Sequence, residues 1–108
     1  MFIAGIPVVP SSGKYKSNIK DFDSSDFFDK INFKIYDKKF NDKIYPQEMG
    51  VLIEDIEKIE GYEKYNLIET KDDEKYLRYY HLFIMCCKEV QKLSLKVQNL
   101  ENILKVNK

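Results

Sequence analysis

Several residue types that commonly build catalytic or metal sites are scarce in this chain of 108 residues. It has no tryptophan, one histidine and two cysteines, and the cysteines are adjacent. Neighbouring side chains on a helix point in different directions, so Cys86 and Cys87 predict neither a disulfide framework nor a metal site. His81 has no cysteine or histidine partner at ligand spacing, so we expect it on a helix surface rather than on zinc. The sequence therefore predicts no metal and no other cofactor.

Net charge and long apolar runs are lacking too. The 18 basic and 18 acidic residues cancel, so no overall positive field attracts nucleic acid or an anionic membrane. The acidic segment 54–74 further argues against a nucleic-acid partner. No run approaches the roughly 18 apolar residues that span a membrane, and residues 1–10 lack the basic start of a secretion signal. We expect one soluble domain with no membrane partner, in the cytoplasm, where thiols stay reduced.

The first third of the chain changes character twice. Residues 1–10, MFIAGIPVVP, are apolar with two prolines, which favours an extended arm over a helix. Residues 11–26 are rich in Ser, Gly, Asn and Asp, and predict surface turns. A single helical turn is expected at 26–30, capped by one of the two serines before it. The alternation of apolar and polar residues at 31–36 then predicts a half-buried strand.

The middle of the chain gives less regular patterns. Residues 37–47 are polar and contain a proline, so we expect a loop. Residues 50–53 predict a short buried strand, and the apolar spacing over 52–59 predicts a short helix that ends near Gly61. A further strand is expected at 65–70 and a charged turn at 71–74.

The clearest pattern lies near the C-terminus, where apolar residues repeat at alternating spacings of three and four. The repeating residues, here called the seam, are Phe83, Cys86, Val90, Leu93, Val97, Leu100 and Leu104. This a/d heptad contains no glycine or proline and predicts a coiled coil of about 30 residues. The alternative is a helix packed on its own domain, although the short remaining chain offers little surface to cover it. Valine at a and leucine at d do not decide the number of chains.

Serines and lysines near the start of the chain offer the main candidate for catalysis. They are Ser11, Ser12, Ser17, Lys14, Lys16 and Lys20. A serine becomes a nucleophile when a base takes its proton, and lysine is such a base when burial or a neighbouring cation lowers its pKa. Taken alone, the local sequence is more typical of a solvated loop.

Five features in a fixed order change the interpretation of that loop. They are Ser11 to Ile19 (SSGKYKSNI), Phe33-Lys34-Ile35-Tyr36, Gly50 to Glu57 (GVLIEDIE), Leu77-Arg78-Tyr79, and the helix that ends near Leu104. Together they resemble the intramolecular chaperone of endosialidase family, the self-cleaving C-terminal domain of phage tail spikes and fibres, which also occurs in myelin regulatory factor. The resemblance spans nearly the whole chain.

The resemblance implies an α+β fold, with a small β-rich head at 11–75 and a helix at 76–108 that forms a parallel trimeric coiled coil. It implies that the homotrimer assists the folding and assembly of a fibrous protein such as a viral tail spike or fibre. For a viral protein, this would take place in the host cytoplasm. Residues 1–10 would be the end of that upstream client or, in a stand-alone relative, an N-terminal arm.

The resemblance also assigns a self-cleaving serine peptidase site. By position, the family's nucleophile falls on Ser11 and its lysine on Lys16, so the bond to be cut is Pro10–Ser11. Neutral Lys16 would take the hydroxyl proton, Ser11 would attack the Pro10 carbonyl, and the ester would be hydrolysed in a single turnover.

The chain departs from the family pattern at three places, where Asp, Arg-Leu and Gln are usual: Ser12, Lys14-Tyr15 and Glu54. A second hypothesis therefore stands beside the first. In it, the protein is a non-catalytic homo-oligomerisation or adaptor module, and Ser11 and Lys16 are loop residues. The seam is expected to serve either function.

Overall fold

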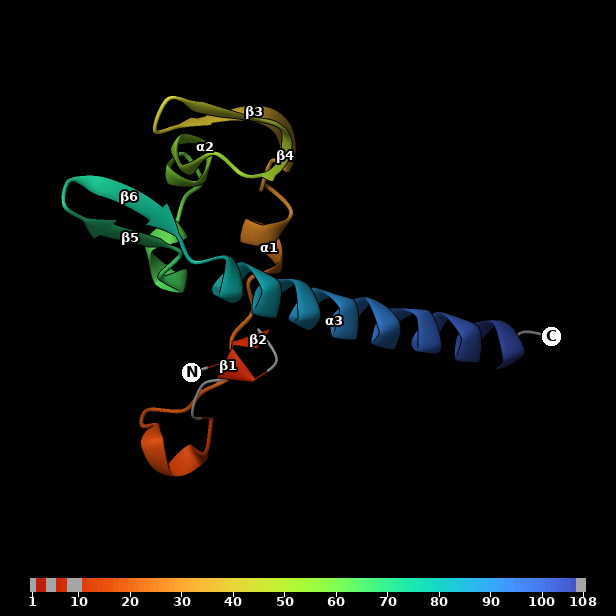
Figure 1. Ribbon diagram of the computed structural model, residues 1–108. Coiled ribbons are helices and arrows are strands. Elements are labelled where there is room, and N and C mark those ends of the chain that lie inside the picture. The colour runs from red at the N-terminus through yellow and green to blue at the C-terminus, as the bar shows by residue number, and fades with distance from the viewer. Residues whose placement is uncertain (1, 4–5, 8–10, 107–108) are drawn as a thin grey trace.

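The computed structural model describes residues 2–3, 6–7 and 11–106, and it shows a small head from which one long helix projects (Figure 1). The strands are β1 (Phe2–Ile3), β2 (Ile6–Pro7), β3 (Lys34–Phe40), β4 (Lys43–Gly50), β5 (Ile68–Lys71) and β6 (Glu74–Leu77). The α-helices are α1 (Ser25–Phe28), α2 (Ile53–Glu57) and α3 (Tyr79–Val106), with 3-10 turns η1 (Gly13–Tyr15) and η2 (Tyr62–Tyr65). Each sheet is an antiparallel pair of consecutive strands. The fold is therefore α+β, the class that the resemblance implies.

The predicted polar loop at 37–47 is wrong, because this segment forms most of the β3–β4 hairpin. Asn41 and Asp42, at the tip, both have positive φ values of 51° and 61°. Two such residues make the tight turn that matches the twist of paired strands, and asparagine and aspartate tolerate this conformation. The hairpin thus needs no glycine at its turn.

The proline that pointed to a loop lies at an irregularity of the same hairpin. The strand register shifts between Tyr36 and Lys38, so Pro46 and Gln47 lie opposite the single residue Asp37. A bulge leaves a residue without ladder hydrogen bonds and therefore accepts a proline. The backbone N–H of Gln47 donates instead to Oδ1 of Asp37, at 3.1 Å. The strand therefore continues through the proline.

The short helices broadly follow the sequence. Helix α1 begins at Ser25 after the N-cap residue Ser24, within the predicted capping pair. The buried strand predicted at 50–53 is wrong, because Gly50 ends β4 and α2 already begins at Ile53. The apolar spacing from Leu52 onward builds this helix instead.

One small core joins the head to the first turns of α3. Its buried members are Phe27, Ile31, Val51, Ile56, Ile59, Leu67, Leu82 and Met85. The strand predicted from 31–36 is only partly correct, because β3 starts at Lys34, and Phe33 and Ile35 are exposed rather than half-buried. The core is therefore made by helices and loops, and the hairpins lie at its edge.

Helix α3 begins at Tyr79, three residues later than the predicted boundary at 76. Residues up to Leu77 pair instead as β6, across the turn at Asp72 and Asp73. The head thus extends two residues beyond 75. Within the described ranges, no helix is long and apolar enough to cross a membrane.

Candidate functional site

Two rows of residues run side by side along α3, and they differ in whether the head covers them. The row that faces the head contains Leu82, Met85, Glu89 and Lys92, at spacings of three and four. Leu82 and Met85 are buried in the core, and Glu89 and Lys92 bond to the segment before α1. The seam follows the same spacing one residue later, which places it about 100° around the helix. The head therefore packs on one face of α3 and leaves the seam uncovered.

The seam residues are exposed along the whole length of the helix. The exposed fractions of its apolar members, from Phe83 to Leu104, lie between 46% and 64%, and Cys86 is exposed as well. Monomeric proteins rarely expose an apolar strip of this kind. The predicted alternative, a helix whose seam packs on its own domain, is not what the single chain does.

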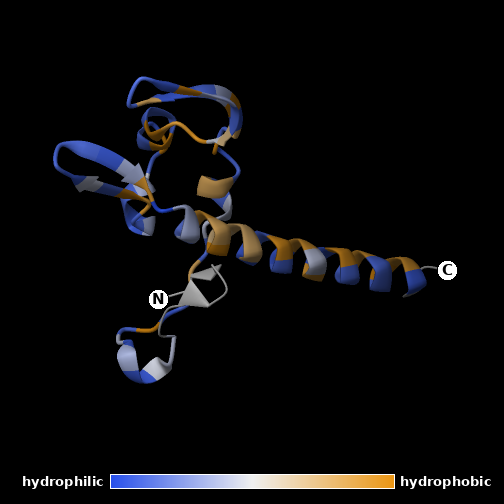
Figure 2. Cartoon of the chain, viewed as in Figure 1, coloured by the Kyte–Doolittle hydropathy of each residue, from blue (hydrophilic) through white to orange (hydrophobic). Residues whose placement is uncertain are grey.

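The C-terminal half of α3 extends beyond the head (Figure 1). Residues from Leu93 to Val106 add about 20 Å of helix at ~1.5 Å per residue. Figure 2 shows that apolar residues continue along one side of α3 to its C-terminal end, opposite a hydrophilic side. Isolated helices of this length are marginal in water, and this half of α3 has little packing against the described part of the head.

A polar cluster ties the segment before α1 to the middle of α3. Lys92 Nζ donates to Asp23 Oδ1 at 2.8 Å and also contacts Ser25 Oγ, and Ser25 Oγ donates to Glu89 at 2.9 Å. The Lys92 ammonium holds the pKa of the Asp23 carboxyl well below its ordinary value, and the same bond raises the pKa of Lys92. Glu89 and Lys92 are therefore the last residues of the head-facing row that these bonds join to the head.

The predicted serine–lysine pair lies together in space. Lys16 Nζ donates a hydrogen bond to Ser11 Oγ at 2.9 Å. The 3-10 turn η1 between them brings this about, with Ser12 at its N-cap accepting from the Lys14 N–H at 3.4 Å. A nucleophile and a base within hydrogen-bond reach satisfy the first geometric requirement for this chemistry.

Both members of the pair are open to solvent. Residues 11–22 are exposed throughout, and Figure 1 shows the η1 turn away from the core. Among the described residues no salt bridge joins Lys16 to Glu54 on α2. Pro10, the other side of the predicted scissile bond, lies outside the described residues. The single chain thus brings the two groups together without burying them.

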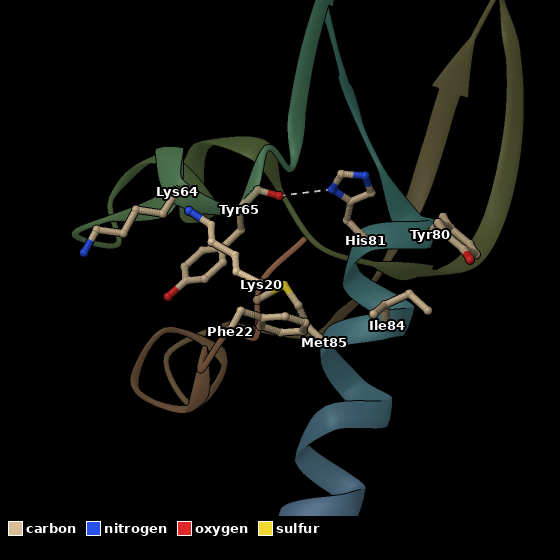
Figure 3. Close-up of a pocket in the computed structure, with 8 residues that line it drawn as sticks. All are labelled: Lys20, Phe22, Lys64, Tyr65, Tyr80, His81, Ile84 and Met85. Atoms are coloured by element: carbon tan, nitrogen blue, oxygen red, sulfur yellow. Dashed lines mark hydrogen bonds between the residues drawn. The ribbon is translucent and has the colours of Figure 1, made fainter. Parts of the chain in front are cut away.

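A groove beside the first turns of α3 was not predicted from the sequence (Figure 3). It has a volume of about 400 Å³, with an apolar lining that includes Phe22, Ile84 and Met85, and with Lys20 and Lys64 also at its wall. The lining residues are far apart in the sequence, so no local motif marks them.

His81 lies on α3, where it lines this groove and is half-buried. Its Nδ1 lies 3.1 Å from the carbonyl oxygen of Tyr65, so the ring joins η2 to the start of α3. In the part of the chain that the structure describes, no three His, Cys, Asp or Glu side chains gather as metal ligands would. His81 thus has a structural contact in this fold.

Comparisons of the chain with protein-family models, curated proteins and solved structures give no match.

Proposed function

We propose that this protein is a homo-oligomerisation domain that associates through the seam of α3. The observation that carries the proposal is the separation of the two rows on α3. The head buries the row that includes Leu82 and Met85, whereas none of the described residues covers the adjacent apolar row, the seam. A second copy offers an identical row, and knobs-into-holes packing of such rows would bury all of it.

Charges beside the seam favour a parallel arrangement in register. With Val90 at an a position, Lys96 falls at g and Glu101 at the following e. In parallel helices a g residue faces the e residue five positions later on its neighbour, so Lys96 would pair with Glu101 of the next chain. The resemblance to the endosialidase chaperone family favours three chains.

In this proposal the trimer serves as a C-terminal intramolecular chaperone for a fibrous, tail-spike-like client. Three chains must be in register before intertwined β structure can form. A parallel coiled coil raises their local concentration and sets that register. The alternative, a non-catalytic adaptor, uses the same seam without a client in the chain.

The association is tested by sedimentation at micromolar concentration. We expect the parent chain to be a trimer and Leu93→Lys to be a monomer, because a lysine at the centre of the seam would bury a charge. The matched control is Gln91→Lys, which adds the same charge in the same turn but off the seam, and it should remain a trimer. A parent chain that is monomeric would refute the proposal.

Self-cleavage at Pro10–Ser11 is a second candidate, favoured by the hydrogen bond between Lys16 and Ser11. Neutral Lys16 would accept the Ser11 hydroxyl proton as Oγ attacks the Pro10 carbonyl carbon. The C–N bond would then break, its nitrogen would take that proton to become a free amine, and water would hydrolyse the ester. In our proposal a neighbouring chain buries the exposed pair, since desolvation favours the neutral lysine.

Cleavage is tested by the intact mass of the chain carrying a longer upstream segment. We expect a product that begins at Ser11 in the parent, and none in Ser11→Ala or Lys16→Ala, with Lys14→Ala as the control that still cuts. Leu93→Lys should also abolish cleavage if trimerisation completes the site. An uncut trimer would leave the adaptor function and exclude the peptidase.

A further inference from the structure

The β3–β4 hairpin presents its polar face to its own chain. Residues two apart on a strand share a face. On the inward face, Lys34 Nζ lies 2.9 Å from Oδ2 of Asp55 on α2, and the hydroxyl groups of Tyr36 and of Tyr79, at the start of α3, lie together beside Gly50. Gly50 lies beside this contact, where an added Cβ would be 2.5 Å from the Tyr79 hydroxyl oxygen. The hairpin is therefore held in a defined position on α2 and α3.

The outward face of the same hairpin is apolar. Phe33 and Ile35 alternate with the inward residues, and Met49 is the direct cross-strand partner of Ile35. These three residues, here called the hairpin patch, have exposed fractions of 60%, 60% and 80%. Together with Lys34 and Gly50 they line a hollow of about 580 Å³. The usual arrangement, with the apolar face inward and the polar face outward, is inverted.

The anchor of the hairpin lies one heptad position before the seam. Tyr79 lies seven residues before Cys86, so it occupies the preceding d position of the heptad. Tyr36 contacts this residue, which places the hairpin at the N-terminal end of the helix–helix interface. Parallel helices in register would bring three hairpins together at that end.

The charge of the hairpin suits association with a copy of itself. Between residues 34 and 50 it carries four lysines and three carboxylates: Lys34, Lys38, Lys39, Lys43, Asp37, Asp42 and Glu48. The signs nearly cancel, so identical hairpins do not repel one another strongly. A nucleic acid or an anionic membrane would instead require a clear positive excess.

We propose that the hairpin patch is a second interface between copies of this chain, continuous with the seam at Tyr79. The inference rests on the proposed oligomerisation through α3. It adds that the head is also assembled, and that Phe33, Ile35 and Met49 are buried against a neighbouring chain. The adjacent edges of the two-stranded hairpins offer further backbone pairing.

A photo-crosslinking experiment tests directly whether a second copy of the chain lies against the hairpin patch. The amino acid p-benzoylphenylalanine, placed at Phe33 of the full chain, should give a covalent product at twice the chain mass after illumination. The control places it at Tyr76 on β6, which is 53% exposed and belongs to the other hairpin. The control should give no product. A chain that sediments as a trimer but gives no interchain product from Phe33 would overturn the hairpin interface and leave the seam intact.

A second variant measures the contribution of the hairpin patch. Met49→Lys should raise the apparent dissociation constant of the oligomer about tenfold or more, because one large apolar side chain would lose its burial. Thr70→Lys on β5 is the control and should leave it unchanged. An unchanged constant for Met49→Lys would contradict the proposal, as would crosslinking of Phe33 only to an upstream client segment. A parent chain that is monomeric would remove the seam and the hairpin interface together.

Discussion

The two halves of α3 are built from similar residues and differ in what surrounds them. In the first half, Leu82 and Met85 close the core of the head. In the second half, Leu93, Val97 and Leu100 are exposed on every turn. Both halves belong to one continuous helix, although only the first packs on the head. The difference teaches that the head covers only one face of α3, and that the described part of the chain leaves the seam exposed.

The largest expected effect separates these halves in the dissociated chain. In a Leu93→Lys background, Ile56→Ala should lower the free energy of unfolding by about 2–5 kcal/mol, because it opens a cavity in the head core. Leu100→Ala in the same background should change it by less than about 0.5 kcal/mol, since that side chain is already in water. Urea unfolding measures both. Equal losses would mean that the seam packs on its own chain.

A smaller effect concerns the junction between the hairpin and α3. Gly50→Ala should destabilise the head by about 1–3 kcal/mol, because its Cβ would overlap the hydroxyl oxygens of Tyr36 and Tyr79. The control is Gly13→Ala, where an added Cβ meets nothing within 4 Å. Thermal unfolding measures the loss. Removing both hydroxyl groups, with Tyr36→Phe and Tyr79→Phe, should restore much of the stability that Gly50→Ala loses. If stability is not restored, the overlap with these hydroxyl oxygens is not the reason for glycine at position 50.

The charges beside the seam give a smaller effect that reports on orientation. Lys96→Glu and Glu101→Lys should each weaken the oligomer by about 0.2–1 kcal/mol for every pair lost, and the double variant should recover it. Dissociation on dilution, followed by sedimentation, measures each variant. Recovery in the double variant fits parallel helices in register. Additive losses would instead indicate that these two residues do not face each other.

The smallest effect concerns the cluster that joins the head to the middle of α3. The folded-state pKa of Asp23 is lowered, so its contribution to stability is full above its ordinary value of 3.8 and is lost as the pH falls through the folded value. Asp23 is exposed and its bond to Lys92 is screened by solvent, so the slope should be shallow. Unfolding of the Leu93→Lys chain between pH 7 and pH 2 measures it. Asp23→Asn should flatten the curve, and an unchanged slope would show that the bond does not persist in solution.

Prediction from the sequence succeeded where the signal was local and repeated. The heptad predicts α3 correctly over most of its length, and helix α2 follows from the spacing of Ile56 and Ile59. The prediction is wrong at 37–47, where Pro46 and the polar composition indicate a loop. The bulge that accommodates Pro46 depends on a residue of the opposite strand, Asp37, which no local pattern includes.

The candidate sites also divide into those that the local sequence predicts and one that it does not. The sequence placed Ser11 and Lys16 five residues apart, and the turn η1 brings their side chains together. The exposed seam was also predicted. The hairpin patch was not, because Phe33 and Ile35 have the alternation of a half-buried strand, and alternation does not tell which face is outward.

The sequence by itself determined the long helix and the register of its apolar row, because these depend on residues a few positions apart. Only the tertiary structure decided which row of α3 the head would cover and which face of the hairpin would remain exposed. Both choices are set by contacts between distant residues: Ser25 with Glu89, Lys92 with Asp23, and Tyr36 with Tyr79. Such contacts select among faces that the local pattern leaves equivalent, and they leave the seam and the hairpin patch exposed.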